Sequence, residues 1–309
     1  MDLHPFRQRT FKQRAAMSGV GLHSGASVRL TIAPAPVDAG IVFVCSGEEV
    51  PALSEFVVDT NLNTSLGRGR VRIGTVEHLL AALSGCGIDN ARIEVEGPEV
   101  PIADGSAEPF VALVREAGIH EQRAPRRYLL VRKSVAVAEG DKLARLSPAR
   151  GRFAVNYTID FRHPLISDQS YRVDLSEKSF QKEIARARTF GFMRDVERLH
   201  SAGLARGGSL DNAVVVDEFN ILNPEGLRYP DEFVRHKILD ALGDLSLLGM
   251  PVIGQLTAKK SGHALNQQLV RKVLTEQGAC EVVQPREADE LHALQESLLP
   301  VLALEEQVA

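Results

Sequence analysis

The sequence predicts an α+β protein built from two units of similar architecture, and three observations support this. The chain has 309 residues, more than a single hydrophobic core usually serves. Before residue 119, short strand-like segments alternate with two helix-like ones. After a polar, basic stretch at 119–127, typical of a linker, the same succession begins again without any identity repeat. We therefore expect two domains, at 1–123 and 124–309.

The first half combines alternating or wholly apolar strand segments with two helices. The helix expected over 75–83 has apolar residues at helical spacing, Thr75 as its N-cap and Gly85 at its end. A second helix is expected to follow Ser106 and to run to about Ala117. The strands expected in this half are Ser27–Ile32, Ile41–Val44 and Ala91–Val95.

The second half repeats this pattern with longer helices. Between Asp231 and Leu248 the apolar residues lie mostly on one side of a long helix. The tail from Val301 is expected to fray. The other expected elements are strands at Tyr128–Val137, Lys142–Leu146, Phe153–Ile159 and Val252–Thr257, and helices at Ser179–Ala187 and Asn266–Gln277.

Composition and charge indicate which binding partners and which cellular compartment are expected. The net charge of −4 gives no surplus of cations for nucleic acid or an anionic membrane. No run of about 18 apolar residues predicts a membrane-spanning helix, and the first residues lack the apolar centre of a secretory signal. Three widely separated cysteines suit a reducing cytoplasm, and they form no close-spaced metal site. Any metal site is therefore expected to use His, Asp and Glu.

The long helix carries a candidate metal-binding face. His236, Asp240 and Asp244 are spaced four residues apart, so they follow one another along one side of the helix. A His and an Asp at this spacing can reach one ion, as in the helical zinc motifs. The alternative is a solvated His–Asp pair on an exposed face. Apolar neighbours such as Leu239 argue against that alternative, because an unpaired carboxylate among them is costly.

Two adjacent residues of the first helix have complementary chemistry. Glu77 and His78 diverge by about 100° around the helix axis, so Glu77 can lie beside a metal held by His78 without binding it. A general base needs that placement, close to a metal-bound water. The alternative is an acidic residue favoured by the helix dipole next to a partly buried histidine.

Two further residues are candidates from their local sequence. His263 follows a glycine, in a loop before a helix. If Asp244 contacts one ring nitrogen, the other nitrogen can protonate a leaving group. The hydroxyl of Thr189 can donate to an oxyanion. The alternatives are a surface histidine and a hydroxyl bonded to local backbone.

These segments together resemble the UDP-3-O-acyl-N-acetylglucosamine deacetylases, the zinc amidases that act at the committed step of lipid A biosynthesis in Gram-negative bacteria. The resemblance covers nearly the whole chain, to about residue 277, with no departure at a catalytic position. The matching stretches are Ser18–Gly25, Thr75–Leu83, Gly87–Ala91, Pro101–Phe110, Ala187–Met193, Gly207–Ser209, Asp231–Asp244 and Lys260–Asn266.

The resemblance implies a fold and a set of roles. It implies two similar domains, each a β-sheet with paired helices, packed as a β-α-α-β sandwich with the active site between them. An inserted strand–helix–strand at about 192–223 is expected to form a tunnel for the acyl chain. The implied roles are zinc ligands at His78, His236 and Asp240, a general base at Glu77, a general acid at His263, an orienting carboxylate at Asp244 and an oxyanion donor at Thr189.

The substrate that the resemblance implies is an amphiphilic sugar nucleotide with a diphosphate. Cations are therefore expected along its path, with Lys237 best placed, and uracil is expected to stack on an exposed aromatic. Zinc is the expected metal, although a His/His/Asp site also accepts ferrous iron. A cytoplasmic enzyme with at most transient proximity to the membrane is expected. The candidate substrate-binding residues are Lys237, Lys260, Arg188, Phe161, Phe190, Met193 and Val196.

Two other functions remain open. A zinc amidase acting on another acylated amino sugar or nucleotide would use every catalytic residue named above. A binding protein stabilised by a non-catalytic ion belongs to a different class. The second is less favoured, because a structural site usually closes all four positions with protein ligands and needs neither Glu77 nor a pair formed by His263 and Asp244.

Overall fold

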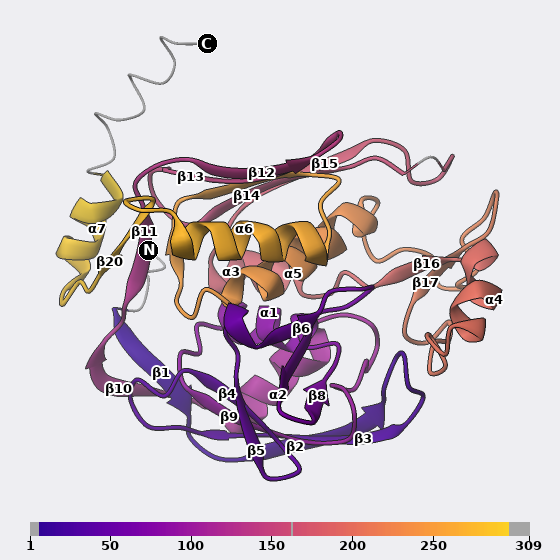
Figure 1. The fold of residues 1–309 in the computed structure, drawn as a ribbon, viewed down its shortest axis with the longest axis horizontal. Coiled ribbons are helices and arrows are strands. Elements are labelled where there is room, and N and C mark those ends of the chain that lie inside the picture. The colour runs from indigo at the N-terminus through magenta and orange to yellow at the C-terminus, as the bar shows by residue number, and fades with distance from the viewer. Residues whose placement is uncertain (1–5, 162, 297–309) are drawn as a thin grey trace.

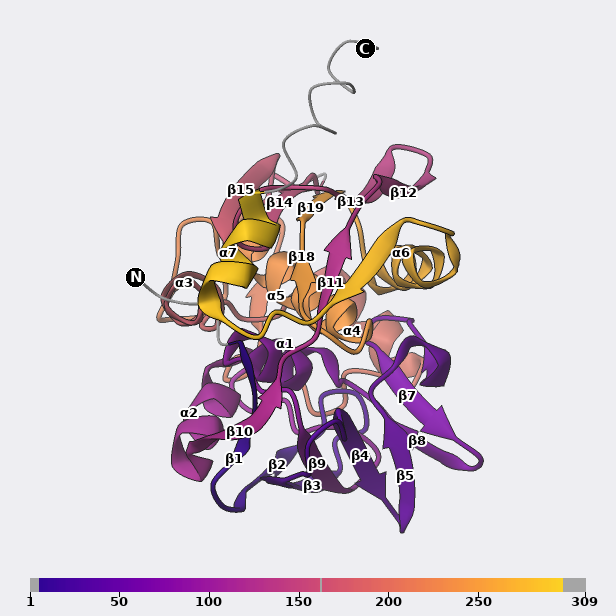
Figure 2. The same ribbon diagram turned by 90° about the vertical axis from the view of Figure 1, so that its left-hand side faces the viewer.

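The two halves of the chain form four layers, sheet on helices on helices on sheet (Figure 1). This is a computed structural model, and it describes residues 6–161 and 163–296. The tail from Val301 lies outside the described residues. One five-stranded sheet forms each outer face, and the helices of both halves meet between the two sheets (Figures 1 and 2). The expected α+β sandwich is confirmed.

The sheet of the first half has the strand order β2-β3-β9-β4-β5. Its helices are α1, which is almost wholly buried, and α2. A small sheet of β6, β7 and β8 precedes α1, with a short 3₁₀ helix, η1, just before it. The bounds are β2 Ala15–Val20, β3 Ser27–Pro34, β4 Ile41–Cys45, β5 Glu48–Pro51, η1 Ser54–Phe56, β6 Val57–Asp59, β7 Ser65–Arg68, β8 Val71–Ile73, α1 Glu77–Gly85, β9 Ala91–Glu96 and α2 Glu108–Ala117.

The sheet of the second half has the matching order β12-β13-β19-β14-β15. In both sheets the third strand pairs in parallel with the fourth, and the other neighbours are antiparallel. In each sheet, the strand that comes last in the sequence is the central one, β9 or β19, and it is preceded by one helix and followed by another. The bounds are β12 Val135–Glu139, β13 Lys142–Ser147, β14 Ala154–Ile159, β15 Gln169–Asp174, α5 Glu232–Ser246, β19 Gln255–Lys259 and α6 His263–Thr275.

The remaining elements lie outside the two five-stranded sheets. The segment between β15 and α5 contains a short helix α3, a π-helix η2, and the unit β16-α4-β17, whose two strands pair in parallel. This unit projects from one end of the molecule (Figure 1). The bounds are α3 Glu177–Ser179, η2 Phe180–Ile184, β16 Phe190–Phe192, α4 Met193–Ser201, β17 Val214–Val216, β1 Arg7–Phe11, β10 Ile119–Pro125, β11 Tyr128–Val131, β18 Val252–Ile253, β20 Cys280–Val283 and α7 Ala288–Glu296.

The central contact lies between α1 and α5, and it depends on a glycine. A Cβ atom at Gly243 would lie 2.1 Å from the carbonyl oxygen of Glu77, far inside van der Waals contact. Only glycine therefore lets the α5 backbone approach the first turn of α1 so closely. This approach brings the catalytic candidates of the two halves together.

The structure corrects several local expectations. The stretch expected as a linker forms β10, which pairs antiparallel with β1 and runs across residues 123 and 124. The strand expected over 128–137 is divided into β11 and β12, and the one over 252–257 into β18 and β19, because the partners belong to two different sheets. Thr75 does not cap α1. Its φ is 55°, and its hydroxyl donates to Glu99 at 2.8 Å.

Candidate active site

A candidate metal-binding group forms where α1 crosses α5. His78 comes from α1, and His236 and Asp240 come from successive turns of α5. One ligand atom from each lies within 4.8 Å of the other two. The two imidazole rings are perpendicular, with centroids 5.0 Å apart. The four-residue spacing therefore places two candidate ligands on one face, and packing of the halves supplies the third.

The protonation states in this group suit a cation. Asp240 Oδ1 lies 3.2 Å from His236 Nε2 and 3.4 Å from His78 Nε2 but has no hydrogen bond. Burial would raise the pKa of Asp240, yet His236 and Lys237 hold it well below its usual range. Burial lowers the pKa of His78, which favours the neutral imidazole. An ionised carboxylate and a neutral imidazole are forms that bind metals, so Asp240 and His78 fit a divalent ion.

The carboxylate of Glu77 lies beside this group and outside it. Its Oε2 accepts a hydrogen bond from the backbone N–H of Thr64 at 3.0 Å, and its Oε1 lies 3.9 Å from His263 Nε2. Burial is the main reason that the pKa of Glu77 is raised to about 7 in the metal-free protein. A carboxylate with such a pKa can accept and release a proton near neutrality.

An oriented histidine faces Glu77 from the second half. His263 Nδ1 lies 2.9 Å from Asp244 Oδ2, and Asp244 also accepts from Thr64 Oγ1 at 2.6 Å and from Asn266 Nδ2 at 2.8 Å. Burial would lower the pKa of His263, but Asp244 outweighs it and the pKa is raised to about 9. The imidazolium is therefore the dominant form at neutral pH, with Nε2–H directed toward the Glu77 side. His263 is the first residue of α6 and does not lie in a loop.

Thr64 and Asn266 are site residues that the sequence did not reveal. Thr64 holds Glu77 through its N–H and Asp244 through its hydroxyl, although Asp244 is 180 positions away along the chain. No local pattern signals such a contact. Asn266 did carry a signal, since it lies three residues after His263 and therefore on the same face of α6.

Thr189 and the two lysines have defined surroundings. Thr189 is half-buried, and its backbone N–H donates to the carbonyl of Gly105 at 2.8 Å. Lys237 Nζ donates to Asp240 Oδ2 at 2.7 Å, so it contacts a candidate ligand directly. Lys260 Nζ lies 2.6 Å from Asp141 and 2.5 Å from Asp160. Lys237 thus lies at the metal group, while Lys260 is neutralised by two acids.

Arg188 is not a cation exposed along the substrate path. Its side chain is 2% exposed and forms a bidentate ion pair with Glu232, which is also buried. The expectation that Arg188 faces a diphosphate is therefore wrong. Its partner lies 44 positions later in the sequence, so local sequence could not identify the pair.

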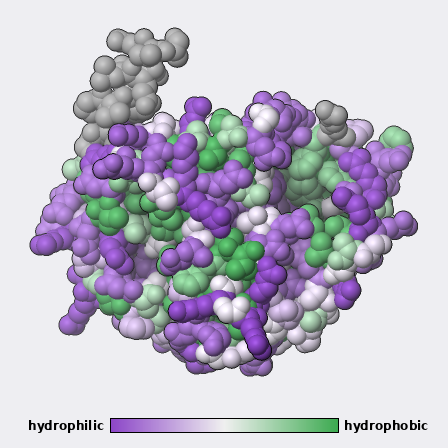
Figure 3. Space-filling view, in the orientation of Figure 1, coloured by the Kyte–Doolittle hydropathy of each residue, from purple (hydrophilic) through white to green (hydrophobic). Residues whose placement is uncertain are grey.

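An aromatic cluster extends from the metal group toward the inserted β16-α4-β17 unit. Phe190 lies 6.2 Å from His236 and 5.5 Å from Phe161, measured between ring centroids. Apolar side chains gather in a hollow over this region (Figure 3). On α4, Met193 is 51% exposed and Val196 is half-buried. Phe161 thus packs against other rings, and this cluster leads from the site to the exposed residues of α4.

The fold brings a candidate metal group and candidate acid–base residues from two similar halves into one site, an arrangement typical of a metal-dependent hydrolase. The family model for UDP-3-O-acyl N-acetylglycosamine deacetylase matches residues 8–275. The chain belongs to this family of amide hydrolases.

Curated relatives are similar over almost the whole length. The UDP-3-O-acyl-N-acetylglucosamine deacetylase of Anaeromyxobacter sp. (strain Fw109-5) is 63% identical over 280 residues, covering 90% of this chain and 92% of the relative. The protein of the same name from Myxococcus xanthus (strain DK1622) is 60% identical over 285 residues, covering 91% and 90%. That of Anaeromyxobacter dehalogenans (strain 2CP-C) is 58% identical over 303 residues, covering 97% and 98%.

Within residues 6–161 and 163–296, none of the helices has the length and apolarity needed to cross a bilayer.

Proposed function

We propose that this protein hydrolyses the acetamide of UDP-3-O-acyl-N-acetylglucosamine, giving UDP-3-O-acyl-glucosamine and acetate, the committed step of lipid A biosynthesis. The relatives carry the name of this deacetylase. The observation that carries the proposal is the convergence of three groups: the metal-binding triad, the Glu77 carboxylate and the His263–Asp244 pair.

The triad of His78, His236 and Asp240 is proposed to hold zinc, with ferrous iron as the alternative. The donor set and the unpartnered Asp240 Oδ1 support a divalent cation. Bound zinc would lower the pKa of a coordinated water and polarise the substrate carbonyl. Three protein ligands leave room for water and substrate, which a purely structural site would not.

The residues of the chain are proposed to move two protons. Glu77 accepts the proton of the attacking water, supported by the N–H of Thr64, which holds its other oxygen. His263 donates its Nε2 proton to the departing sugar amine while Asp244 holds Nδ1–H. The hydroxyl of Thr189 donates to the developing oxyanion.

The substrate is proposed to extend from the metal group over the aromatic cluster. Lys237 and Lys260 would face the diphosphate, with Lys260 exchanging its two carboxylate partners for it. Phe161 is proposed to contact the uracil. The acyl chain would lie along Phe190, Met193 and Val196, at the insert of residues 192–223, where the apolar hollow of Figure 3 supports this path.

The domain division and the setting of the reaction are also proposals. Domains at 1–123 and 124–309 are proposed because each range contains one five-stranded sheet, with β10 crossing the boundary between them. A cytoplasmic location suits a sugar-nucleotide substrate and three free thiols.

The deciding experiment combines metal analysis with acetate release from synthetic substrates of graded acyl length. We expect one zinc per chain and release of acetate that depends on acyl length and is blocked by a hydroxamate chelator. Equal activity on an acylated amino sugar without UDP would favour the alternative zinc amidase. Bound metal with no hydrolysis of any amide would identify a binding protein instead.

A further inference from the structure

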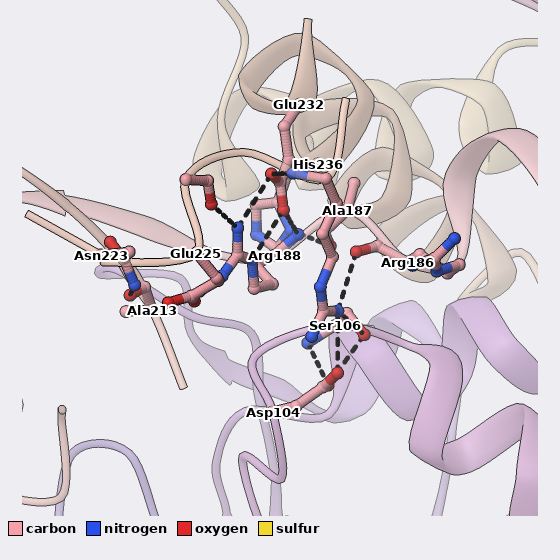
Figure 4. Close-up of polar contacts among 12 residues, drawn as sticks. Asp104, Ser106, Arg186, Ala187, Arg188, Ala213, Asn223, Glu225, Glu232 and His236 are labelled. Atoms are coloured by element: carbon pink, nitrogen blue, oxygen red, sulfur yellow. Dashed lines mark hydrogen bonds and ion pairs between the residues drawn. The ribbon is translucent and has the colours of Figure 1, made fainter. Parts of the chain in front are cut away.

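The peptide unit that joins Ala187 to Arg188 is held at both ends by α5. The carbonyl oxygen of Ala187 accepts a hydrogen bond from His236 Nδ1 at 3.1 Å, and the N–H of Arg188 donates to Glu232 Oε1 at 2.9 Å. The C=O and N–H of a trans peptide point in opposite directions in one rigid plane. Glu232 and His236 lie one turn apart on α5, so one peptide plane spans the gap between their side chains (Figure 4).

The carboxylate of Glu232 is itself fixed. It is 0% exposed, and besides the N–H of Arg188 it accepts from Arg188 Nε at 2.9 Å, Arg188 Nη2 at 3.2 Å and the N–H of Arg228 at 2.6 Å. The guanidinium of Arg188 also donates to Glu225 at 2.5 Å and to the carbonyl of Gly226 at 2.7 Å. The anchor of the 187–188 peptide is therefore rigid.

The same segment is tied to the first half of the chain. Arg228 Nη1 donates to Asp104 Oδ2 at 2.8 Å and to the carbonyl of Arg186 at 3.0 Å. The N–H of Thr189 donates to the carbonyl of Gly105 at 2.8 Å. The segment from 186 to 189 is thus fixed relative to both halves, which supply different ligands to the metal group.

From these contacts we infer that Glu232 is a positioning residue for His236, acting through the 187–188 peptide. A carbonyl only accepts hydrogen bonds, so the contact with Ala187 places the proton on His236 Nδ1 and leaves Nε2 with its lone pair toward Asp240. Glu232 fixes that carbonyl and hence the tautomer and direction of the imidazole. The inference rests on the proposed function, because it assigns His236 as a metal ligand.

The test compares Glu232→Gln with the wild type in three measurements. The substitution replaces one acceptor oxygen by a donor, which must face the N–H of either Arg188 or Arg228, and it removes the charge that pairs with Arg188, so the anchor of the 187–188 peptide is weakened. Changes to the groups that hold a metal ligand in place typically weaken metal binding by about 10- to 100-fold. We expect that loss of zinc affinity in competition with a chromophoric chelator, an altered visible spectrum of the Co²⁺-substituted protein, and a mixed His236 tautomer in ¹⁵N NMR of the metal-free protein.

Two further variants keep the test decisive. Glu232→Asp retains the charge opposite Arg188 but withdraws the carboxylate, and it replaces the Gln variant if that one does not fold. Asp231→Asn is the matched control, because it removes the adjacent carboxylate, at the N-cap of α5, and its ion pair with Arg235 without touching the 187–188 peptide. We expect Asp231→Asn to bind zinc as the wild type does.

The outcomes separate the inference from the proposed function. If the folded Glu232 variants keep wild-type zinc affinity and Co²⁺ spectrum, the inference is overturned even if their melting temperature falls. A His236 that carries its proton on Nε2 in the metal-free wild type also overturns it. If His236→Ala binds zinc as tightly as the wild type, the ligand assignment fails, and with it the proposed function.

Discussion

Two clusters of buried charge lie two turns apart on α5, around Glu232 and Asp240. The Glu232 carboxylate accepts three hydrogen bonds from Arg188 and one from Arg228. In the Asp240 cluster, Oδ2 accepts from Lys237, but Oδ1 and His78 Nδ1 have no hydrogen-bond partner among the described residues. Both carboxylates are almost fully buried, so exposure does not explain the difference.

The hydrogen-bond partners distinguish a buried charge that stabilises the fold from one that can bind a ligand. A buried polar atom without a partner costs about 1–3 kcal/mol, and more if it is charged. The Glu232 cluster avoids this cost with groups of the chain itself. The Asp240 cluster bears it in the free protein, and a bound cation would supply the missing partner. Between these two clusters, the unpaired Asp240 Oδ1 therefore distinguishes the candidate metal site more clearly than buried charge does.

The largest effect is expected from His236→Ala. Loss of one of three ligands should remove the metal and its stabilisation of charge, worth several kcal/mol, so activity should fall by at least about 10³-fold. Metal analysis and acetate release measure the two losses. Zinc should raise the melting temperature of the wild type and not of this variant. If the variant still binds one zinc, His236 is not a required ligand, and the interpretation of the Asp240 cluster as a metal site is wrong.

Glu77→Ala should separate metal binding from proton transfer. Glu77 lies beside the metal group without belonging to it. We therefore expect full zinc content with turnover lowered by about 10²- to 10⁴-fold, the usual contribution of a general base. Zinc content that falls in parallel with turnover would show instead that Glu77 is a ligand.

Disrupting the Glu232 cluster should lower the free energy of unfolding even when no zinc is bound. Arg188→Met leaves Glu232 buried and without its main partner, which typically costs about 3–5 kcal/mol. The surface pair of Arg198 and Asp195 offers the control, since Arg198 is 77% exposed and Arg198→Met should cost at most about 1 kcal/mol. Urea unfolding in the presence of a chelator measures both. Equal stabilities of the two variants would contradict this interpretation of the Glu232 cluster.

Sequence reasoning predicted the features that depend on local periodicity. The repeated α+β pattern, the one-turn spacing of His236 and Asp240, and the divergence of Glu77 from His78 all follow from residues close together in the chain. The structure preserves each of them, because helical geometry fixes which neighbours share a face. The resemblance to a known family supplied the pairing of the two helices.

What sequence reasoning missed depends on contacts between distant segments. Arg188 was expected among the cations along the substrate path, because its partner Glu232 is 44 positions away and gave no local signal. The segment at 119–127 looked like a linker because β1, the partner of the strand within it, lies near the N-terminus. Thr64 gave no signal at all, although it bonds groups of both halves. Such partners become visible only when the sheets and helices are packed.

The smallest expected effect is on the pH dependence of turnover, and it tests whether the two titrating groups are Glu77 and His263, which lie beside the Asp240 cluster. Glu77 must be deprotonated to accept a proton, so the rate should rise with pH through its pKa, about 7 in the metal-free protein. A bound cation stabilises the carboxylate and should move this limb to lower pH. His263 must be protonated, so the rate should fall about tenfold per pH unit above its pKa of about 9.

The variant His263→Ala assigns the alkaline limb. It removes the proton donor, so the residual activity should keep the rise at acidic pH and lose the decline above about pH 9. Thr64→Val is the subtler companion, because it removes one hydrogen bond to Asp244 while leaving the backbone N–H that holds Glu77. Weaker orientation of Asp244 should shift the alkaline limb and leave the acid limb in place. An unchanged alkaline limb in His263→Ala would mean that another group donates the proton to the amine.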